Sequence, residues 1–440
     1  MVSRAHPHGD DDIRLLGDDS FEQSDEKDNL ISFDDTSGLR HRGPSSSHKK
    51  PLSAARSVSP SSAQDSPKGP VVAVFVVVFD AKQGNRIEWS HTVDGSVDIG
   101  GVEYKALPSG AHTVSSDSLT FKIGSYYGVA YFRTETDKSS ARGAVFRSCG
   151  LLGRRLEDIV GFRTVLQSEL SQGKHSTGDY HVLEDLVGGR SDFVDNAFTP
   201  VMERVNKSEI ELMHDNKIVR DFCTLLGADI FRLWKCVLLR KRILILGTPP
   251  FADLCHIAHL CSLIGNYDIS SPLRPDYNLL LYVDLNDIDK LRQSKTFVAC
   301  TSELIYQLKN DCYDVLIMKN QLHIQDPALQ RTCLTSAMEK ENFSELMHDY
   351  NLRSSIMHVD SGRFDATEFV GGYFTALNEK ILSAFHAADC TAEQTIADSA
   401  LEDLSLNPAS DVPFLQALAN MHCPSIRVQR QPLCPQCHLC

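Results

Sequence analysis

The stretch VVAVFVVVFD, residues 71–80, restricts the fold of this chain more than any other feature. Nine apolar residues, most of them β-branched valine, run without a charge before Asp80. A transmembrane helix needs roughly 20 apolar residues, so this run is too short to cross a bilayer. The turn signal Gly84-Asn85 follows, and RIEWSHT then continues with a second apolar pattern. The stretch therefore predicts a buried strand that enters a β-hairpin.

Composition and charge exclude several classes of protein. The 440 residues are 42% hydrophobic and 23% charged, which is ordinary for a soluble globular protein of two or three domains. The net charge of −14 argues against non-specific binding of nucleic acid, since such binding needs a basic face for phosphate. The 13 cysteines and an acidic amino terminus without an apolar signal region indicate a cytoplasmic protein with reduced thiols. We therefore expect no nucleic-acid partner and no transmembrane segment.

Residues 1–70 have a composition that is typical of disorder. The first half of this segment is acidic, as in DDSFEQSDEKD. The second half is basic and rich in serine and proline, as in HRGPSSSHKKPLSAARSVSP. Such a segment cannot bury enough apolar surface to offset the entropy lost on folding. We predict a disordered arm over residues 1–70.

Two short patterns in this arm fit peptides that coat and adaptor proteins bind. Both place apolar side chains beside acids, and such peptides fill adaptor pockets in an extended form. The residues are Asp11, Leu15 and Leu16 for an acidic dileucine signal, and Leu30, Phe33 and Asp34 for a clathrin box. Patterns this short also arise by chance. The arm is therefore a candidate contact for clathrin adaptors, with chance occurrence as the alternative.

The apolar periodicity predicts an α/β fold for the rest of the chain. Strands are expected at 71–79, 86–91, near 119–123, 127–133 and 142–149, followed by a helix over 156–170. From residue 195 to 330, short apolar strands alternate with helical patterns, which indicates a three-layer unit with a largely parallel sheet. Residues 331–390 are helical in pattern. Residues 391–440 lose periodicity, and we expect an irregular tail that contains cysteines.

Seven strings in the ordered part of the chain carry a resemblance to a known family. They are FDAKQGNRIEWS (79–90), LPSGAH (107–112), YYGVAYFR (126–133), LLRKRILILG (238–247), RPDYNLLLYV (274–283), FVACTSELI (297–305) and YDVLI (313–317). Their order and spacing resemble the DENN-domain family over about residues 71–386. The resemblance implies a longin-like upstream module at 71–190, a central α/β DENN module at 195–330 and a downstream helical module at 331–390.

The same resemblance implies guanine-nucleotide exchange on a Rab-type small GTPase that docks between the two lobes. An exchange factor does no covalent chemistry, because it acts by binding the nucleotide-free GTPase better than the nucleotide-bound form. We therefore expect no catalytic residue, cofactor or metal of the chain's own. Its partners would be the GTPase with GDP, GTP and Mg²⁺. It would act in membrane traffic, in the cytoplasm or peripherally on endosomes or vesicles.

An arginine after the strand YYGVAYFR gives a sharper hypothesis. In SSARGAVFRS, Arg142 lies where the related folliculin-type proteins supply an arginine finger for GTPase activation. A finger stabilises transition-state charge and contributes roughly 10³–10⁵ in rate. Those proteins have an aromatic residue directly after the glycine, whereas this chain has Ala144. The alternative is that Arg142 starts a strand and pairs with an acid. Arg133 and Arg147 are further candidates for GTPase contact.

Other patterns fit metal or nucleotide sites only in part. Cys434, Cys437 and Cys440 are spaced as overlapping CxxC pairs, but a paired CxxC…CxxC arrangement is absent. His256 and His259 share one helix face without a third ligand, so we expect packed histidines. GTPPF, after a predicted strand, lacks the lysine of a phosphate-binding loop.

Three functions stay open, namely exchange, activation through Arg142 and a non-catalytic adaptor role.

Overall fold

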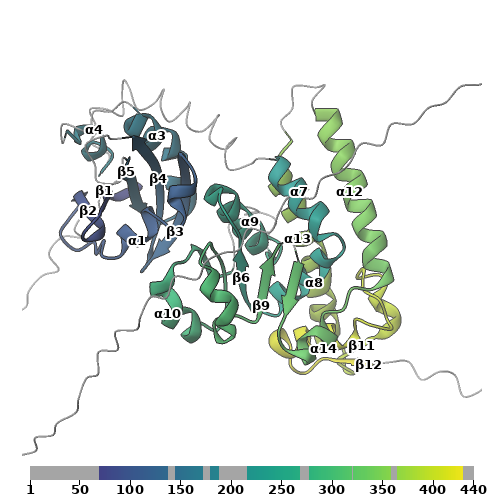
Figure 1. Ribbon diagram of the computed structural model, residues 1–440. Helices are drawn as coiled ribbons and strands as arrows, with labels where there is room; N and C mark the ends of the chain where they lie inside the picture. Colours follow the sequence, from purple (N-terminus) through teal and green to yellow (C-terminus); the bar gives the residue numbers. More distant parts are fainter. Residues whose placement is uncertain are drawn as a thin grey trace, which may run out of the picture. The chain divides into compact units, whose positions relative to one another are not determined.

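The structure, a computed structural model, describes residues 69–136, 144–171, 179–187, 216–267, 277–319, 321–357 and 364–429. All of them belong to one compact unit that begins at Gln64. The largest element is a mixed sheet with the strand order β10-β9-β6-β8-β7-β3-β4-β5-β1-β2, and helices pack on it (Figure 1). This arrangement confirms the expected α/β class.

The first half of the sheet is antiparallel. Its strands are β1 (Val71–Asp80), β2 (Gly84–Thr92), β3 (Ser116–Ile123), β4 (Tyr126–Thr136) and β5 (Ala144–Gly153). Its helical elements are α1 (Val102–Ala106), η1 (Ala111–Thr113), α2 (Leu156–Ile159), η2 (Val160–Phe162), α3 (Arg163–Ser171) and α4 (His181–Glu184). We call residues 71–187 the antiparallel half.

The stretch VVAVFVVVFD forms β1, which pairs with both β5 and β2. Its first eight residues are buried, because neighbours cover both faces of this inner strand. Val74 and Val76 pack with α3, whereas Phe75 and Val77 join the main core on the other face. The strand ends where the Asp80 carboxylate accepts hydrogen bonds from two backbone amides of the following turn. The predicted hairpin is confirmed.

The second half of the sheet is mainly parallel. Its strands are β6 (Arg242–Leu246), β7 (Leu279–Tyr282), β8 (Phe297–Thr301) and β9 (Val315–Met318), with β10 (Gln321–Ile324) antiparallel at the edge. The helical elements up to this edge are α7 (Asn216–Leu226), α8 (Asp229–Leu238), α9 (Phe251–Leu263), η5 (Leu285–Asp287), α10 (Ile288–Gln293), η6 (Leu304–Leu308) and η7 (Asn310–Cys312). Three helices follow, α11 (Pro327–Thr332), α12 (Ala337–Met357) and α13 (Ala366–Asp389). We call residues 216–429 the parallel half.

The strands of the parallel half bury both faces. On β6, Ile243 and Ile245 belong to the main core with residues of α8, α9 and α13. Leu244 and Leu246 belong to a second core with Leu291 of α10 and Tyr306 of η6. Helical elements therefore lie on both sides of the sheet, as expected for a three-layer unit. The helical stretch before β6 is divided in two, since Gly227 takes a positive φ of 58° and separates α7 from α8.

The expectation of an irregular segment after residue 390 is wrong for residues 391–429. They contain β11 (Thr395–Ala397), η8 (Asp398–Leu401), α14 (Val412–His422) and β12 (Arg427–Gln429). Phe414, Leu415 and Leu418 of α14 are fully buried, and the Phe414 ring lies 5.6 Å from that of Trp234 in α8. Periodicity failed to show this segment because the strands have three residues each and the helix is short. The segment is part of the core of the parallel half.

A buried ion cluster ties this segment to α8 and α12. The side chain of Lys235 is 0% exposed, and so are those of its two acidic partners. Its Nζ lies 2.7 Å from Oε1 of Glu339 and 2.8 Å from Oδ1 of Asp411, and it also donates to the carbonyl of Leu334. Removing one partner of a buried ion pair is strongly destabilising, because the other charge stays buried. The cluster therefore makes Asp411 a structural residue.

We predict that Asp411→Ala lowers the free energy of unfolding by about 3 kcal/mol, because Lys235 then keeps only one carboxylate in a dry environment. Urea unfolding of the full chain, followed by the fluorescence of Trp234 and Trp89, measures the change. Asp403→Ala is the matched control, since Asp403 is exposed in the same segment and should change stability by less than about 0.5 kcal/mol. Equal stabilities of the two variants would contradict the prediction.

Candidate docking site

The two halves of the sheet meet where β3 pairs with β7. The pairing is parallel and joins Phe121 to Tyr282. Two further contacts fix the junction. The carboxylate of Asp117 on β3 accepts a hydrogen bond from the backbone amide of Phe251, the first residue of α9. The thiol of Cys255, also on α9, donates to the carbonyl of Thr120 at 3.3 Å. From Asp117 to Phe121, β3 is thus held by both a strand and a helix of the parallel half.

A second buried ion cluster lies at this junction. Lys105 of α1 is 4% exposed, and its Nζ lies 3.0 Å from Oδ2 of Asp284 and also contacts the carboxylate of Asp287. Both acids come from the turn after β7, where each carboxylate accepts a backbone hydrogen bond of η5. Lys290 adds a second positive charge, 3.8 Å from Asp287. Two acids thus face two lysines, and the charges of this cluster balance.

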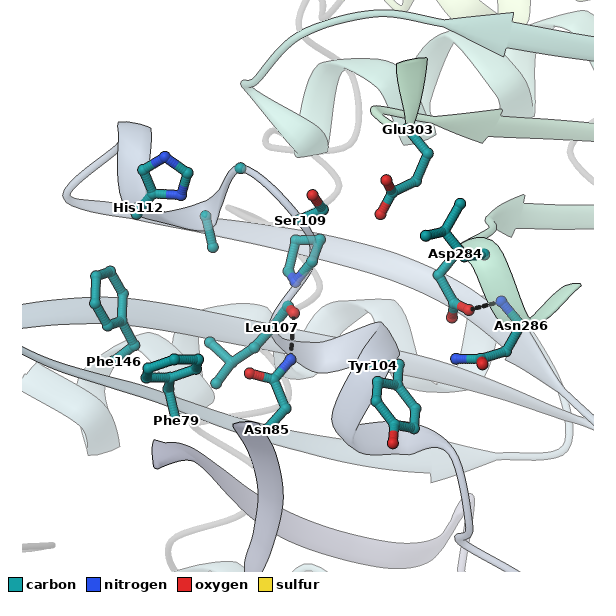
Figure 2. A pocket seen from close by; sticks show the side chains of 14 residues that line it. Phe79, Asn85, Tyr104, Leu107, Ser109, His112, Phe146, Asp284, Asn286 and Glu303 are labelled. Carbon is teal, nitrogen blue, oxygen red and sulfur yellow. Dashed lines mark hydrogen bonds between the residues drawn. The ribbon is translucent and has the colours of Figure 1, made fainter. Parts of the chain in front are cut away.

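A cavity of about 550 Å³ opens beside this cluster (Figure 2). Its lining combines the β1–β2 hairpin, the segment from α1 to η1 and one residue of β5 with two segments of the parallel half. The residues are Phe79, Asn85, Tyr104, Leu107, Pro108, Ser109, Gly110, Ala111, His112, Phe146, Asp284, Leu285, Asn286 and Glu303. The side chain of Asn85 donates to the carbonyls of Leu107 and Glu103, at 2.8 and 3.1 Å. This amide holds the α1–η1 segment against the hairpin.

One wall of the cavity is aromatic and the opposite side is acidic. The rings of Phe79 and Phe146 pack edge to face, with centroids 6.0 Å apart. Figure 2 shows Glu303 and Asp284 reaching the cavity from the side opposite these rings. Burial raises the pKa of the Glu303 carboxyl, the charge of Asp284 raises it further, and a hydrogen bond with Ser109 opposes the shift. The site therefore combines apolar surface with a partly desolvated carboxylate.

Exposed apolar side chains lie beside the cavity, and we call them the apolar rim. They are Tyr104 (46% exposed), Leu285 (47%), Leu304 (68%), Ile305 (39%) and Leu308 (78%). Tyr104 and Leu285 line the cavity itself, and the other three lie on η6, directly after Glu303. Exposed large apolar side chains that gather at one place on a protein often mark sites of protein–protein contact, and chain order places these next to the cavity. This arrangement of exposed apolar side chains beside the cavity favours docking of a partner protein.

The predicted arginines Arg133 and Arg147 lie opposite each other on β4 and β5. By strand alternation they share the sheet face of Tyr131 and Cys149, which packs with α3, whereas Phe146 faces the cavity. Arg147 lies 3.3 Å from the Glu88 carboxylate, which also accepts a hydrogen bond from the Tyr180 hydroxyl. The structure thus brings the two arginines together, but on the face away from the cavity.

The remaining sequence predictions divide into two groups. The first lies outside the described residues and comprises Arg142, Asp11, Leu15, Leu16, Leu30, Phe33, Asp34, Cys434, Cys437 and Cys440. The second is the histidine pair of α9, where Nε2 of His256 lies 2.9 Å from the hydroxyl of Thr367 on α13 and His259 is buried. These histidines pack between helices. Within the described ranges, no group of three His, Cys, Asp or Glu side chains is arranged to hold a metal ion.

Sequence reasoning missed Lys105, Asp284 and Glu303. A signal for the site was nevertheless present, because three of the seven strings that carry the family resemblance contribute residues to the cavity. All six residues of LPSGAH line it, and FDAKQGNRIEWS and FVACTSELI contribute Phe79, Asn85 and Glu303.

In the part of the chain that the structure describes, no helix is both long and apolar enough to span a membrane.

We predict that Lys105→Met destabilises the chain by about 3–5 kcal/mol, since it leaves Asp284 and Asp287 buried without their closest cation. Denaturant unfolding measures the loss. Lys82→Met is the control, because Lys82 is exposed in the β1–β2 turn and should change stability by no more than about 0.5 kcal/mol. A Lys105 variant as stable as the control would show that the cluster does not hold the junction.

Comparison with known proteins places this site in a family. The model of the family described as DENN domain-containing protein 11 matches residues 74–328, a range that includes the whole cavity lining. DENN domain-containing protein 11 of Danio rerio is 29% identical over 386 residues, covering 84% of this chain and 78% of its own length. The Xenopus laevis protein of the same name is 28% identical, covering 80% and 84%. An uncharacterized protein of Saccharomyces cerevisiae, ANR2, is 26% identical, covering 56% and 57%. The chain belongs to the DENN domain-containing protein 11 family, which confirms the resemblance noted in its sequence.

Proposed function

We propose that this protein is a guanine-nucleotide exchange factor that promotes GDP release from a Rab-type small GTPase in membrane traffic. The observation that carries the proposal is the family match over residues 74–328. DENN proteins are in general exchange factors for Rab GTPases. The matched range extends across both halves of the sheet and contains the junction between them.

An exchange factor needs a surface with a particular property. It must bind the nucleotide-free GTPase better than the GDP-bound form, because only differential affinity shifts the equilibrium toward release. A rigid surface can supply this by holding a switch loop away from the Mg²⁺ and phosphates. Balanced buried charges at Lys105 and the β3–β7 pairing support such rigidity at the junction. The apolar rim supports docking of the GTPase there.

The first experiment measures release of mant-GDP from a panel of purified Rab GTPases, with hydrolysis of GTP followed in parallel. The full chain is used, because residues 391–429 belong to the core. Faster release from one or a few GTPases is the expected result. Unchanged release with faster hydrolysis would replace this proposal with activation through Arg142. No effect on either would contradict both and favour the non-catalytic adaptor role.

We predict that the paired change Leu304→Asp and Leu308→Asp lowers kcat/KM for exchange by roughly tenfold or more, because charges enter the centre of an apolar contact. The chain offers a matched control on α12. There, Leu352 and Ile356 have the same spacing and are 51% and 50% exposed. Leu352→Asp with Ile356→Asp should leave exchange unchanged. If both double variants exchange equally well, the apolar rim is not the docking surface.

A further inference from the structure

The charges that line the cavity are unequally compensated. Asp284 has Lys105 at 3.0 Å, so its carboxylate is neutralised within the ion cluster. Glu303 lines the same cavity, and its interactions are a hydrogen bond with Ser109 and repulsion from Asp284. Among the residues that the structure describes, no lysine or arginine lies within ion-pair distance of Glu303. The cavity therefore carries one negative charge that is not balanced from within the described chain.

The carboxylate of Glu303 is also partly desolvated. Burial raises the pKa of this group, which means that the cavity disfavours its charged form. A cation that enters the cavity would offset this loss of hydration with a direct, charge-assisted hydrogen bond. An anion would instead be repelled, because the uncompensated carboxylate of Glu303 faces the cavity. A phosphate or an acidic peptide is therefore a poor occupant.

The other walls restrict which cation fits. Phe79 and Phe146 present aromatic surface opposite Glu303, with Leu107 beside them, and Tyr104 also lines the cavity (Figure 2). A guanidinium group is planar, stacks on aromatic rings and binds a carboxylate through two N–H groups. Its apolar stem is suited to a wall of aromatic and aliphatic side chains. A metal ion would need more oxygen ligands than one uncompensated carboxylate supplies.

We propose that the cavity receives an arginine side chain of the docked GTPase, with Glu303 binding the guanidinium and Phe79 and Phe146 packing against its stem. The inference rests on the proposed function for the identity of the partner. The position of the cavity next to the apolar rim supports it, since an arginine anchored in a pocket is typical of the residues that dominate protein interfaces. Glu303 would thus select GTPases that carry arginine at the matching position.

The first test uses small probes and needs no GTPase. N-acetyl-L-arginine amide and its neutral isostere N-acetyl-L-citrulline amide are titrated against the full chain by saturation-transfer NMR. We expect the arginine probe to bind better than citrulline, and Glu303→Gln to weaken it roughly ten- to hundredfold, as for loss of a hydrogen bond to a charged group. Glu341→Gln, an exposed glutamate on α12, is the control for lost charge. Equal binding of the two probes, or binding unaffected by Glu303→Gln, would overturn the inference.

The second test uses the GTPase that the exchange panel identifies. Glu303→Gln should lower kcat/KM for exchange roughly tenfold while melting at the same temperature as the unchanged chain. Glu303→Arg should abolish exchange, and replacing the contacting arginine of the GTPase by glutamate should restore it. If Glu303→Gln alters neither probe binding nor exchange, the inference fails and the exchange function stands. If no GTPase responds to the unchanged chain, the proposed function fails, and the probe titration still decides whether the cavity binds arginine.

Discussion

The buried cluster of Lys105 with Asp284 and Asp287 is the interaction on which the candidate site depends. Its lysine comes from the antiparallel half and its acids from the turn after β7, so one charge cluster fixes the relative position of the segments that line the cavity. The desolvation of these groups is costly, and only close pairing offsets it. The cluster also removes Asp284 from the charge balance of the cavity. Glu303 is then the acid of the cavity that has no lysine or arginine within ion-pair distance among the described residues.

Much of the fold was predictable, because the signals are local. Each signal occupies one continuous segment of the sequence. Examples are the valine-rich run at 71–80, the short apolar strands of the parallel half and the helical spacing of α13. The contacts that assemble the site are not local. Lys105 and Asp287 are separated by 182 positions, and nothing in either sequence neighbourhood indicates the other. A lysine on a short helix is normally exposed, and only the topology shows that this one is buried.

The candidate site was predicted less well than the fold, and the arginines show why. Arg133 and Arg147 were chosen by residue type, yet strand alternation places them on the face that packs with α3. Our proposals still include an arginine at the contact with the GTPase, but this arginine belongs to the GTPase and not to the chain described here. The chain supplies a carboxylate and aromatic surface, and the arginine comes from the partner. Residue type alone does not show whether the arginine belongs to this chain or to the partner, because that depends on which face of the sheet the partner can reach.

The carboxy-terminal segment has a consequence for how the protein is made. Phe414 packs on Trp234, and Asp411 supplies a carboxylate to Lys235, yet both partners on α8 leave the ribosome long before residues 411 and 414. Until these residues have been synthesised, Lys235 of α8 lacks one of its two carboxylate partners and Trp234 is not covered by Phe414. The antiparallel half packs α3 on a core of its own and can begin to fold earlier. The parallel half completes its core only after α14 has been translated, so the uncovered surface of α8 is the one that chaperones would need to protect until then.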